Sequence, residues 1–285
     1  MGTDDGESGQ RGFLRRILAE GGERLGVPVA GAAVFSWRDR TIGAPAARDG
    51  DRYWLRATGE HHDWAGGDSW TGCRDANALT GIPRPELLGQ VEWTEDNVEI
   101  YAQLMTLAPG APCSPTPELR EEIELSDSWW TALSDALTLL ASSDSHPREP
   151  RTQGLVTDAV RLCFGDWVDP AVTAWTTTHG DLHWANLMAP DLWILDWEFW
   201  RRAEAGLDAA TLYCHSLLVP PVAAKVHEAF ADALESPSGR LAQLSVIAHL
   251  LRRADGGDHP DLVLPLPLAG QAPTQDEPCS LRRST

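Results

Sequence analysis

The sequence lacks the marks of several large protein classes. Its five cysteines are scattered and form no CxxC pair, which argues against a disulfide framework or a zinc ribbon and indicates a reducing compartment. No run approaches the roughly 18 apolar residues of a membrane-spanning helix, and residues 1–10 lack the apolar core of a secretory signal. We therefore expect a cytoplasmic protein without a membrane partner.

Glycine-rich phosphate motifs and basic residues are also scarce. The chain has neither G-x-G-x-x-G nor a Walker A sequence, which disfavours a P-loop nucleotide hydrolase. Its 23 basic residues face 42 acidic ones, giving a net charge of −19. A net negative charge of this size repels nucleic acid and anionic membrane surfaces. It favours a cationic small molecule, such as an aminocyclitol antibiotic or a polyamine, although an acidic surface also serves solubility.

The sequence does contain a compact set of acids and amides between residues 177 and 198. Asp181 is followed five residues later by Asn186, and Asp196 closes the apolar run Leu192–Leu195, which has the length of a strand. A loop, a strand and an acid at the strand end would bring two carboxylates and an amide around one small volume. Phosphoryl transfer needs such a set, because a carboxylate orients the hydroxyl nucleophile and oxygen ligands hold Mg²⁺ on the nucleotide phosphates.

The segments His179-Gly-Asp-Leu-His-x-x-Asn186 and Ile194-Leu-Asp-Trp-Glu198 resemble the catalytic core of the aminoglycoside phosphotransferase and choline kinase superfamily. These are small-molecule kinases of the protein-kinase-like fold. The resemblance implies an α+β bilobal fold, with a small antiparallel-sheet N-lobe and a larger, mainly helical C-lobe. It also implies ATP or GTP as phosphoryl donor, Mg²⁺, and a small hydroxylated acceptor. With the acidic balance, we expect an amine-bearing acceptor such as an aminoglycoside or a related amino sugar.

In the C-lobe the resemblance implies a catalytic base at Asp181 and Mg²⁺ ligands at Asn186 and Asp196. The segment that starts at Gly206 resembles the family's G-x-D-x-A-x-L helix start. By that resemblance, Asp208 caps the helix and braces the catalytic loop.

Three further residues of the motif have less defined roles. His179 is expected to support the catalytic loop through bonds to its backbone. His183 is either a substrate contact or a packed loop histidine. Glu198 either faces the substrate's amines or a second metal, or it is a solvated carboxylate.

In the N-lobe the family's third strand carries a lysine that binds the nucleotide phosphates, and Arg56 stands at that position. Arginine keeps the positive charge and adds a planar fork suited to phosphate, so Arg56 could bind the nucleotide phosphates. The alternative is that Arg56 is only a surface arginine on a strand. Asp75 is the candidate for the acid that steadies it. The hinge between the lobes would place Met105 beside adenine, with the Thr106 carbonyl and the Ala108 N–H on the base edge.

The rest of the chain predicts an N-lobe over residues 1–107 and a C-lobe over residues 108–285, of which 265–285 form an irregular tail. Apolar periodicity and turn residues supply the elements. The expected strands are 27–37, 41–47, 52–57, 91–93 and 99–107. The expected helices are 11–25, one around residue 75, one long helix from about 114 to 141, 152–164, a short one starting at 169, 220–234 and 241–253.

Other interpretations of the same residues stay open. The pattern His179-x-Asp181-x-His183 also has transition-metal ligand chemistry, and with Asp196 it would suit a metallohydrolase. The missing lysine allows a catalytically decayed, kinase-like binding protein. Among active kinases, a housekeeping kinase for a sugar or an amino alcohol is the alternative to an antibiotic-modifying enzyme. The oligomeric state is a monomer or a homodimer.

Overall fold

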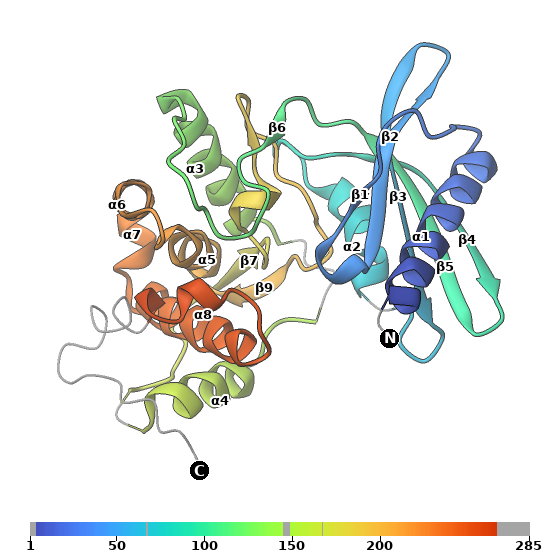
Figure 1. The fold of residues 1–285 in the computed structure, drawn as a ribbon. Coiled ribbons are helices and arrows are strands. Elements are labelled where there is room, and N and C mark those ends of the chain that lie inside the picture. Colours follow the sequence, from blue (N-terminus) through green and yellow to red (C-terminus); the bar gives the residue numbers. More distant parts are fainter. Residues whose placement is uncertain (1–3, 67, 145–148, 167, 267–285) are drawn as a thin grey trace. The chain divides into compact units, whose positions relative to one another are not determined.

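The computed structural model describes residues 4–66, 68–144, 149–166 and 168–266 (Figure 1). Packing divides the chain into two compact units. Residues 1–77 with 84–109 form the first, and residues 78–83 with 110–285 form the second. Within the described residues, no helix combines the length and the apolar character needed to cross a membrane. The predicted tail falls outside the described residues, apart from its first two positions.

The first unit is built on one antiparallel sheet of five strands in the order β1-β2-β3-β5-β4. Helices α1 and α2 accompany it, with two short 3-10 turns at Trp37–Asp39 and Ala76–Ala78 (Figure 1). The bounds are α1 (Asp4–Leu25), β1 (Val34–Phe35), β2 (Thr41–Arg48), β3 (Asp51–His61), α2 (Asp68–Asp75), β4 (Leu87–Glu95) and β5 (Val98–Thr106).

Turn residues between β2 and β3, and the alternation of side chains along β3, explain the central part of this sheet. Asp49 and Gly50 join β2 to β3 with φ angles of 55° and 92°, a conformation that glycine, and to a lesser degree aspartate, adopts readily. Along β3, Leu55 and Ala57 are fully buried in a core that they share with apolar residues of α1. Because side chains alternate along a strand, Arg56 between them points to the opposite face.

Two predictions for this unit are corrected. Helix α1 begins at Asp4 rather than at residue 11. The strand predicted over 27–37 shrinks to β1, because Pro28 has no N–H to donate and the preceding segment makes a single isolated bridge, between Val29 and Ala46. The other predicted strands are confirmed as β2, β3, β4 and β5, with somewhat different ends.

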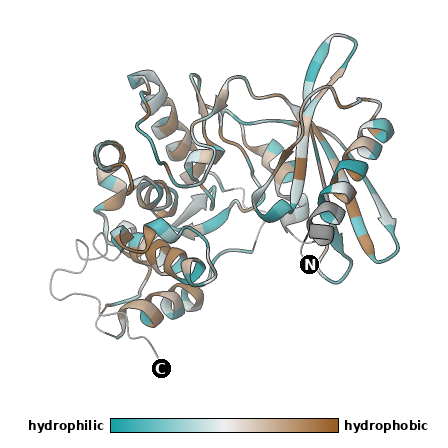
Figure 2. Cartoon of the chain, in the orientation of Figure 1, coloured by the Kyte–Doolittle hydropathy of each residue, from teal (hydrophilic) through white to brown (hydrophobic). Residues whose placement is uncertain are grey.

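The second unit is mainly helical, with two small antiparallel pairs of strands, β6 with β8 and β7 with β9. Most residues of α5 and many of α8 are buried, and these two helices pack together at its centre; Figure 2 shows the apolar residues along α8. The bounds are β6 (Ala111–Pro112), α3 (Asp127–Ala141), α4 (Gln153–Phe164), β7 (Trp175–Thr178), β8 (Met188–Ala189), β9 (Arg201–Glu204), α5 (Leu207–Ser216), α6 (Pro220–Ala229), α7 (Ala231–Leu234) and α8 (Pro237–Asp255), with 3-10 turns at Trp184–Asn186 and Pro260–Leu262.

The long helix predicted from about residue 114 is corrected. Helix α3 begins at Asp127, where the hydroxyl of Ser126 accepts the N–H of Trp129 at 3.2 Å and caps it. Residues 113–125 are irregular, and Pro115 and Pro117 remove backbone donors there. The cap signals at Ser114 therefore do not start a helix.

Two other predictions in this unit are also wrong. The segment after Asp169 is not helical, because the side chain of Gln153 bonds the Pro170 carbonyl at 2.6 Å and the Val172 N–H at 2.9 Å. The run 192–195 forms one isolated bridge, at Ile194, instead of a strand. The N–H of Ile194 donates to the carbonyl of Pro83 at 2.8 Å, and the N–H of Leu195 donates to the carbonyl of Asn186 at 2.8 Å.

Candidate active site

The predicted catalytic loop follows β7 in the second unit and turns at Gly180. Gly180 has a φ of 82°, and a Cβ built on it would lie 2.5 Å from the carbonyl oxygen of Phe199. Both the left-handed conformation and the close backbone approach require glycine. The His179-Gly-Asp181 sequence therefore fixes the point where the side chain of Asp181 emerges.

Two buried side chains hold this loop. The carboxylate of Asp208, in the first turn of α5, accepts the N–H of His179 at 2.7 Å and that of Gly180 at 2.9 Å. Burial raises the pKa of the Asp208 carboxyl above its ordinary value, and the two N–H bonds oppose that shift. The His179 ring donates from Nε2 to the carbonyl of Leu195 at 2.8 Å, and its Nδ1 accepts the N–H of Asp181 at 3.4 Å.

The cap of α5 differs from the prediction. Gly206, with a φ of 92°, is the N-cap residue, and no side chain caps the helix there. Asp208 lies inside the first turn, where its carboxylate is committed to the catalytic loop. Asp208 therefore braces the loop but does not cap the helix.

The two predicted Mg²⁺ ligands lie on neighbouring backbone segments. The side-chain amide of Asn186 donates to the carbonyl of Asp181 at 3.0 Å. The N–H of Leu195 donates to the carbonyl of Asn186 at 2.8 Å, so Asp196 directly follows a residue that is bonded to Asn186. Asp196 has a φ of 61°, a conformation that costs a residue with a Cβ about 1–2 kcal/mol. An amide oxygen and a carboxylate are the hard oxygen donors that Mg²⁺ prefers, so these residues fit that ion.

Asp181 is the accessible acid of the loop. Its side chain is 33% exposed, and Oδ2 lies 3.5 Å from Nε2 of His183. Burial alone would raise the pKa of the Asp181 carboxyl, but the bond to His183 and the charge that this ring carries when protonated outweigh it and hold the pKa well below its ordinary value. The carboxylate is therefore ionised at neutral pH and can accept a hydrogen bond.

Three histidines run from Asp181 into the interior of the unit. The ring centroids of His183 and His215 lie 5.6 Å apart, as do those of His215 and His259. His259 in turn has Nδ1 2.8 Å from Oε2 of Glu118, and both side chains are 6% exposed. Burial and the charge of His183 lower the pKa of His215 to about 3, so this ring is neutral at pH 7.

Sequence reasoning missed His215, His259 and Glu118. One signal for His215 was present, because it follows Asp208 by seven residues on the same helix and so shares its face. Glu118 and His259 are separated by 141 residues and carry no local pattern that joins them.

Helix α3 supports the loop through its tryptophans. The indole N–H of Trp129 donates to the carbonyl of Met188 at 2.8 Å, and the ring stacks on Trp184 with centroids 6.4 Å apart. Both rings are nearly fully buried. These tryptophans belong to the core around the predicted catalytic loop.

Glu198 is buried, at 6% exposure, so the alternative of a solvated carboxylate is wrong.

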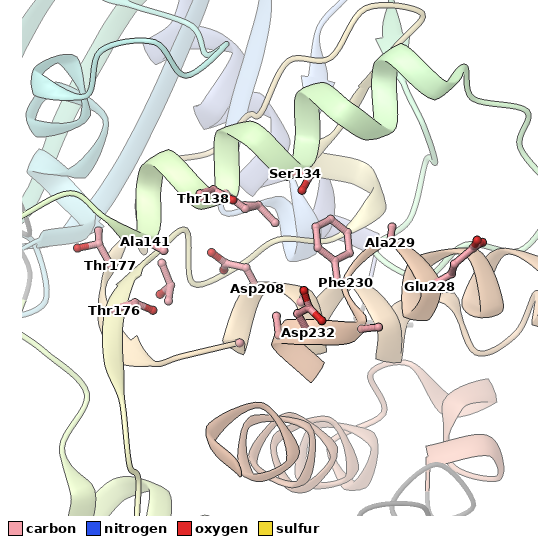
Figure 3. Close-up of a pocket in the computed structure, with 16 residues that line it drawn as sticks. Ser134, Thr138, Ala141, Thr176, Thr177, Asp208, Glu228, Ala229, Phe230 and Asp232 are labelled. Carbon is pink, nitrogen blue, oxygen red and sulfur yellow. The ribbon is translucent and has the colours of Figure 1, made fainter. Parts of the chain in front are cut away.

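A separate cavity of about 380 Å³ lies among α3, β7, α5, α6 and α7 (Figure 3). Asp208 lines it together with Thr177, Phe230 and Asp232. Asp181 is absent from the described residues that line it.

Arg56 lies in the middle of β3 and is buried, at 9% exposure, so the alternative of a surface arginine is wrong. Its Nη1 lies 3.8 Å from Sγ of Cys73 in α2. The predicted ion pair with Asp75 is also wrong, since none joins the two among the described residues. Asp75 lies beside Arg74 instead, with 3.7 Å between Oδ1 and Nε. Residues two apart on a helix point to different sides, so α2 presents Cys73 rather than Asp75 to Arg56.

The sequence offers no lysine to replace Arg56. Its single lysine, Lys225, is exposed on α6, with Nζ 3.5 Å from a carboxylate oxygen of Glu228. A cationic contact between the first unit and a phosphate would therefore depend on arginine or protonated histidine.

The predicted adenine contacts lie at the end of β5. Met105 is buried, and Thr106 and Ala108 are half-buried. The N–H of Thr106 donates to the carbonyl of Glu86 at 3.0 Å, and its hydroxyl accepts the Glu86 N–H at 2.9 Å. These bonds fix the end of the strand, and the base contacts themselves stay a prediction.

No protein-family model and no curated protein matches the sequence. Solved structures do resemble the chain. Aminoglycoside phosphotransferase APH(4)-Ia matches with a TM-score of 0.56 and 12% identity, over 86% of this chain and 94% of that one. Spectinomycin phosphotransferase APH(9)-Ia, in complex with ADP and spectinomycin, matches with a TM-score of 0.50 and 12% identity, over 88% of each chain. The likeness confirms the predicted α+β kinase-like fold.

Proposed function

We propose that the protein is a phosphotransferase that moves the γ-phosphoryl group of ATP or GTP to a hydroxyl of a small, amine-bearing molecule. The observation that carries the proposal is the hydrogen-bonded arrangement that brings Asp181, Asn186 and Asp196 onto adjoining backbone segments. The fold shared with two antibiotic phosphotransferases supports the same reaction class. Fold alone does not set the substrate, so the acceptor is argued from charge.

In this proposal Asp181 receives the hydrogen bond of the acceptor hydroxyl and directs its oxygen toward the phosphoryl group. The depressed pKa of Asp181 makes it a weak base. Because phosphoryl transfer has a loose transition state, little proton transfer is needed before the new bond forms. The carboxylate therefore acts first by orientation and takes the proton late.

Asn186 and Asp196 would hold Mg²⁺, which when bound neutralises charge on the nucleotide phosphates. Asn186 also bonds the carbonyl of Asp181, so the same side chain links the metal ligands to the base. His183 keeps the Asp181 carboxylate ionised and oriented. Arg56 of the first unit is the proposed ligand of the nucleotide phosphates, because it is a buried arginine in a unit without lysine.

The net charge of −19 favours a cationic acceptor, such as an aminoglycoside or a related amino sugar. Glu198 and His183 are the proposed contacts for its amines and hydroxyls. A housekeeping kinase for a sugar or amino alcohol would use the same catalytic residues. The proposal keeps the cytoplasmic location that the scattered cysteines predict.

A screen of hydroxylated compounds tests this function. Purified protein with Mg²⁺ and ATP or GTP would be offered aminoglycosides, spectinomycin, amino sugars and amino alcohols. We expect substrate-dependent release of ADP or GDP and a product that gains one phosphoryl group by mass spectrometry. Asp181→Asn should lower turnover by about 100-fold to 10,000-fold while nucleotide binding persists. The matched control is Asp191→Asn, an exposed acid of the following turn.

Other outcomes would replace the proposal. Failure to bind nucleotide in calorimetry would indicate a decayed kinase-like protein. Hydrolysis that needs zinc and no nucleotide would indicate a metallohydrolase. Near-normal turnover in Asp181→Asn would remove this residue from its catalytic role.

A further inference from the structure

Strand β3 ends in a turn that carries three metal-ligand side chains in succession, His61, His62 and Asp63. One ligand atom from each lies within 4.8 Å of the others. Nδ1 of His61 is 3.4 Å from one carboxylate oxygen of Asp63, and Nε2 of His62 is 3.0 Å from the other. Imidazole nitrogen and carboxylate oxygen are donors that Zn²⁺ and related transition metals take in proteins.

Backbone hydrogen bonds hold this turn in place. The carbonyl of His61 accepts the N–H of Trp64 at 2.8 Å and that of Ala65 at 2.9 Å. The N–H of His62 donates to the carbonyl of Asn97, in the turn between β4 and β5, at 2.9 Å. The three side chains therefore project from a fixed backbone, which lowers the entropy cost of gathering them around an ion.

The three ligand side chains are accessible to ions in solution. The side chains of His61, His62 and Asp63 are 40%, 52% and 64% exposed. Solvent can thus deliver an ion to the ligands without any rearrangement of the core.

We propose that His61, His62 and Asp63 bind one divalent transition-metal ion, with Zn²⁺ the preferred ion. Three protein ligands leave room for water to complete the coordination. The donor set of two nitrogens and a carboxylate differs from the oxygen pair of Asn186 and Asp196, so the two sites select different metals. An ion here would tie the end of β3 to its own turn and stabilise the first unit, because it binds the folded chain.

Zinc titration of the full-length protein tests this site. After treatment with a chelator, calorimetry should show one equivalent of Zn²⁺ bound. His61→Ala, His62→Ala and Asp63→Asn should each weaken binding by more than about tenfold, since even changes outside the ligand sphere often reach that size. His62 and Asp63 are exposed and His61 is half-buried, so the variants should fold, which thermal unfolding would check.

Three controls separate this site from others. His227→Ala removes a histidine of the second unit, Asp196→Ala removes a predicted Mg²⁺ ligand, and Cys73→Ser removes a thiol. All three should keep the zinc equivalent. Visible absorption of bound Co²⁺ should be present in the wild type and absent in a His61→Ala/His62→Ala variant. Equal zinc binding by the wild type and that double variant would overturn the proposal, as would loss of the equivalent in Cys73→Ser. Neither result touches the phosphotransferase proposal, which uses other residues.

Discussion

The carboxylate of Asp208 accepts the backbone N–H of His179 at 2.7 Å, so a residue of helix α5 holds the first residue of the catalytic loop. The same carboxylate accepts the next N–H, that of Gly180, with its other oxygen. Both bonds are made away from water, since Asp208 is 7% exposed. The position of Asp181 therefore depends on a buried side chain of another element.

Asp208→Asn should separate this positioning role from chemistry. The amide supplies one acceptor oxygen and places an N–H₂ group opposite a backbone N–H, which should cost about 1–3 kcal/mol of unfolding free energy. Displacement of Asp181 should lower turnover by about 100-fold. Urea unfolding and the ADP-release assay would measure the two effects. Asp232→Asn, an exposed acid at the same cavity, is the control and should change neither.

Gly180→Ala should damage both stability and activity. The added Cβ meets the Phe199 carbonyl in a left-handed backbone conformation, so we expect a loss of more than about 1 kcal/mol of unfolding free energy. Gly154→Ala is the matched control, because that glycine lies in the first turn of α4 with no close neighbour, so alanine should fit there without loss of stability. Comparable stability of the two variants in urea would contradict the steric argument at Gly180.

Acid should destabilise the protein through buried His215. Burial lowers the pKa of this imidazole to about 3. The unfolded chain takes up the proton near pH 6.5, so the contribution of His215 to stability is complete above that pH and is lost as the pH falls toward 3. This histidine should add a slope of up to about 1.4 kcal/mol per pH unit. Urea unfolding between about pH 7 and pH 5 would measure it.

The His215→Gln variant checks the source of that slope. Removing this titrating group should reduce the slope of unfolding free energy against pH by the contribution of one proton. His227→Gln in the same unit should leave that slope unchanged. An unaltered slope in His215→Gln would place the acid sensitivity elsewhere.

Arg56→Ala should weaken binding of ATP or GTP by more than about tenfold, because a charge-assisted hydrogen bond to phosphate is worth about 1.5–3 kcal/mol. Arg56→Lys should recover part of the affinity, since it restores the charge without the planar fork. Arg52→Ala, an exposed arginine of the same strand, should bind nucleotide normally. Calorimetry with Mg²⁺ and nucleotide measures all three, and unchanged affinity in Arg56→Ala would exclude this residue as a phosphate ligand.

Local pattern predicted the parts of the fold that local physics determines. Strands β2 to β5 alternate or follow turn residues, and α4 carries a clear cap at Thr152, whose hydroxyl accepts the Leu155 N–H at 3.3 Å. The start of α3 was misplaced because cap residues at Ser114 and Ser126 look alike in sequence. Only the second is followed by an uninterrupted run of backbone donors.

The candidate site also contains residues that local spacing predicts and contacts that only the tertiary fold determines. Asp181, Asn186 and Asp196 could be found because the loop that joins them is short and its spacing is fixed. The pairing of Arg56 with Cys73 rather than Asp75 depends on the rotation of α2, which no residue spacing determines. The contact of Glu118 with His259 needs the tertiary fold, since 141 residues separate them.

The solitary Lys225 has a practical consequence for how this protein can be detected. Nucleotide probes that label kinases by transferring an acyl group to a lysine amine require a lysine beside the nucleotide, and Lys225 lies on α6, outside the proposed nucleotide ligands. Activity profiling with such probes should pass over the protein even when it is active. Conversely, the chain offers an amine-reactive dye one side-chain amine, so the only side chain labelled would be on α6, at a residue other than Arg56 and Asp181.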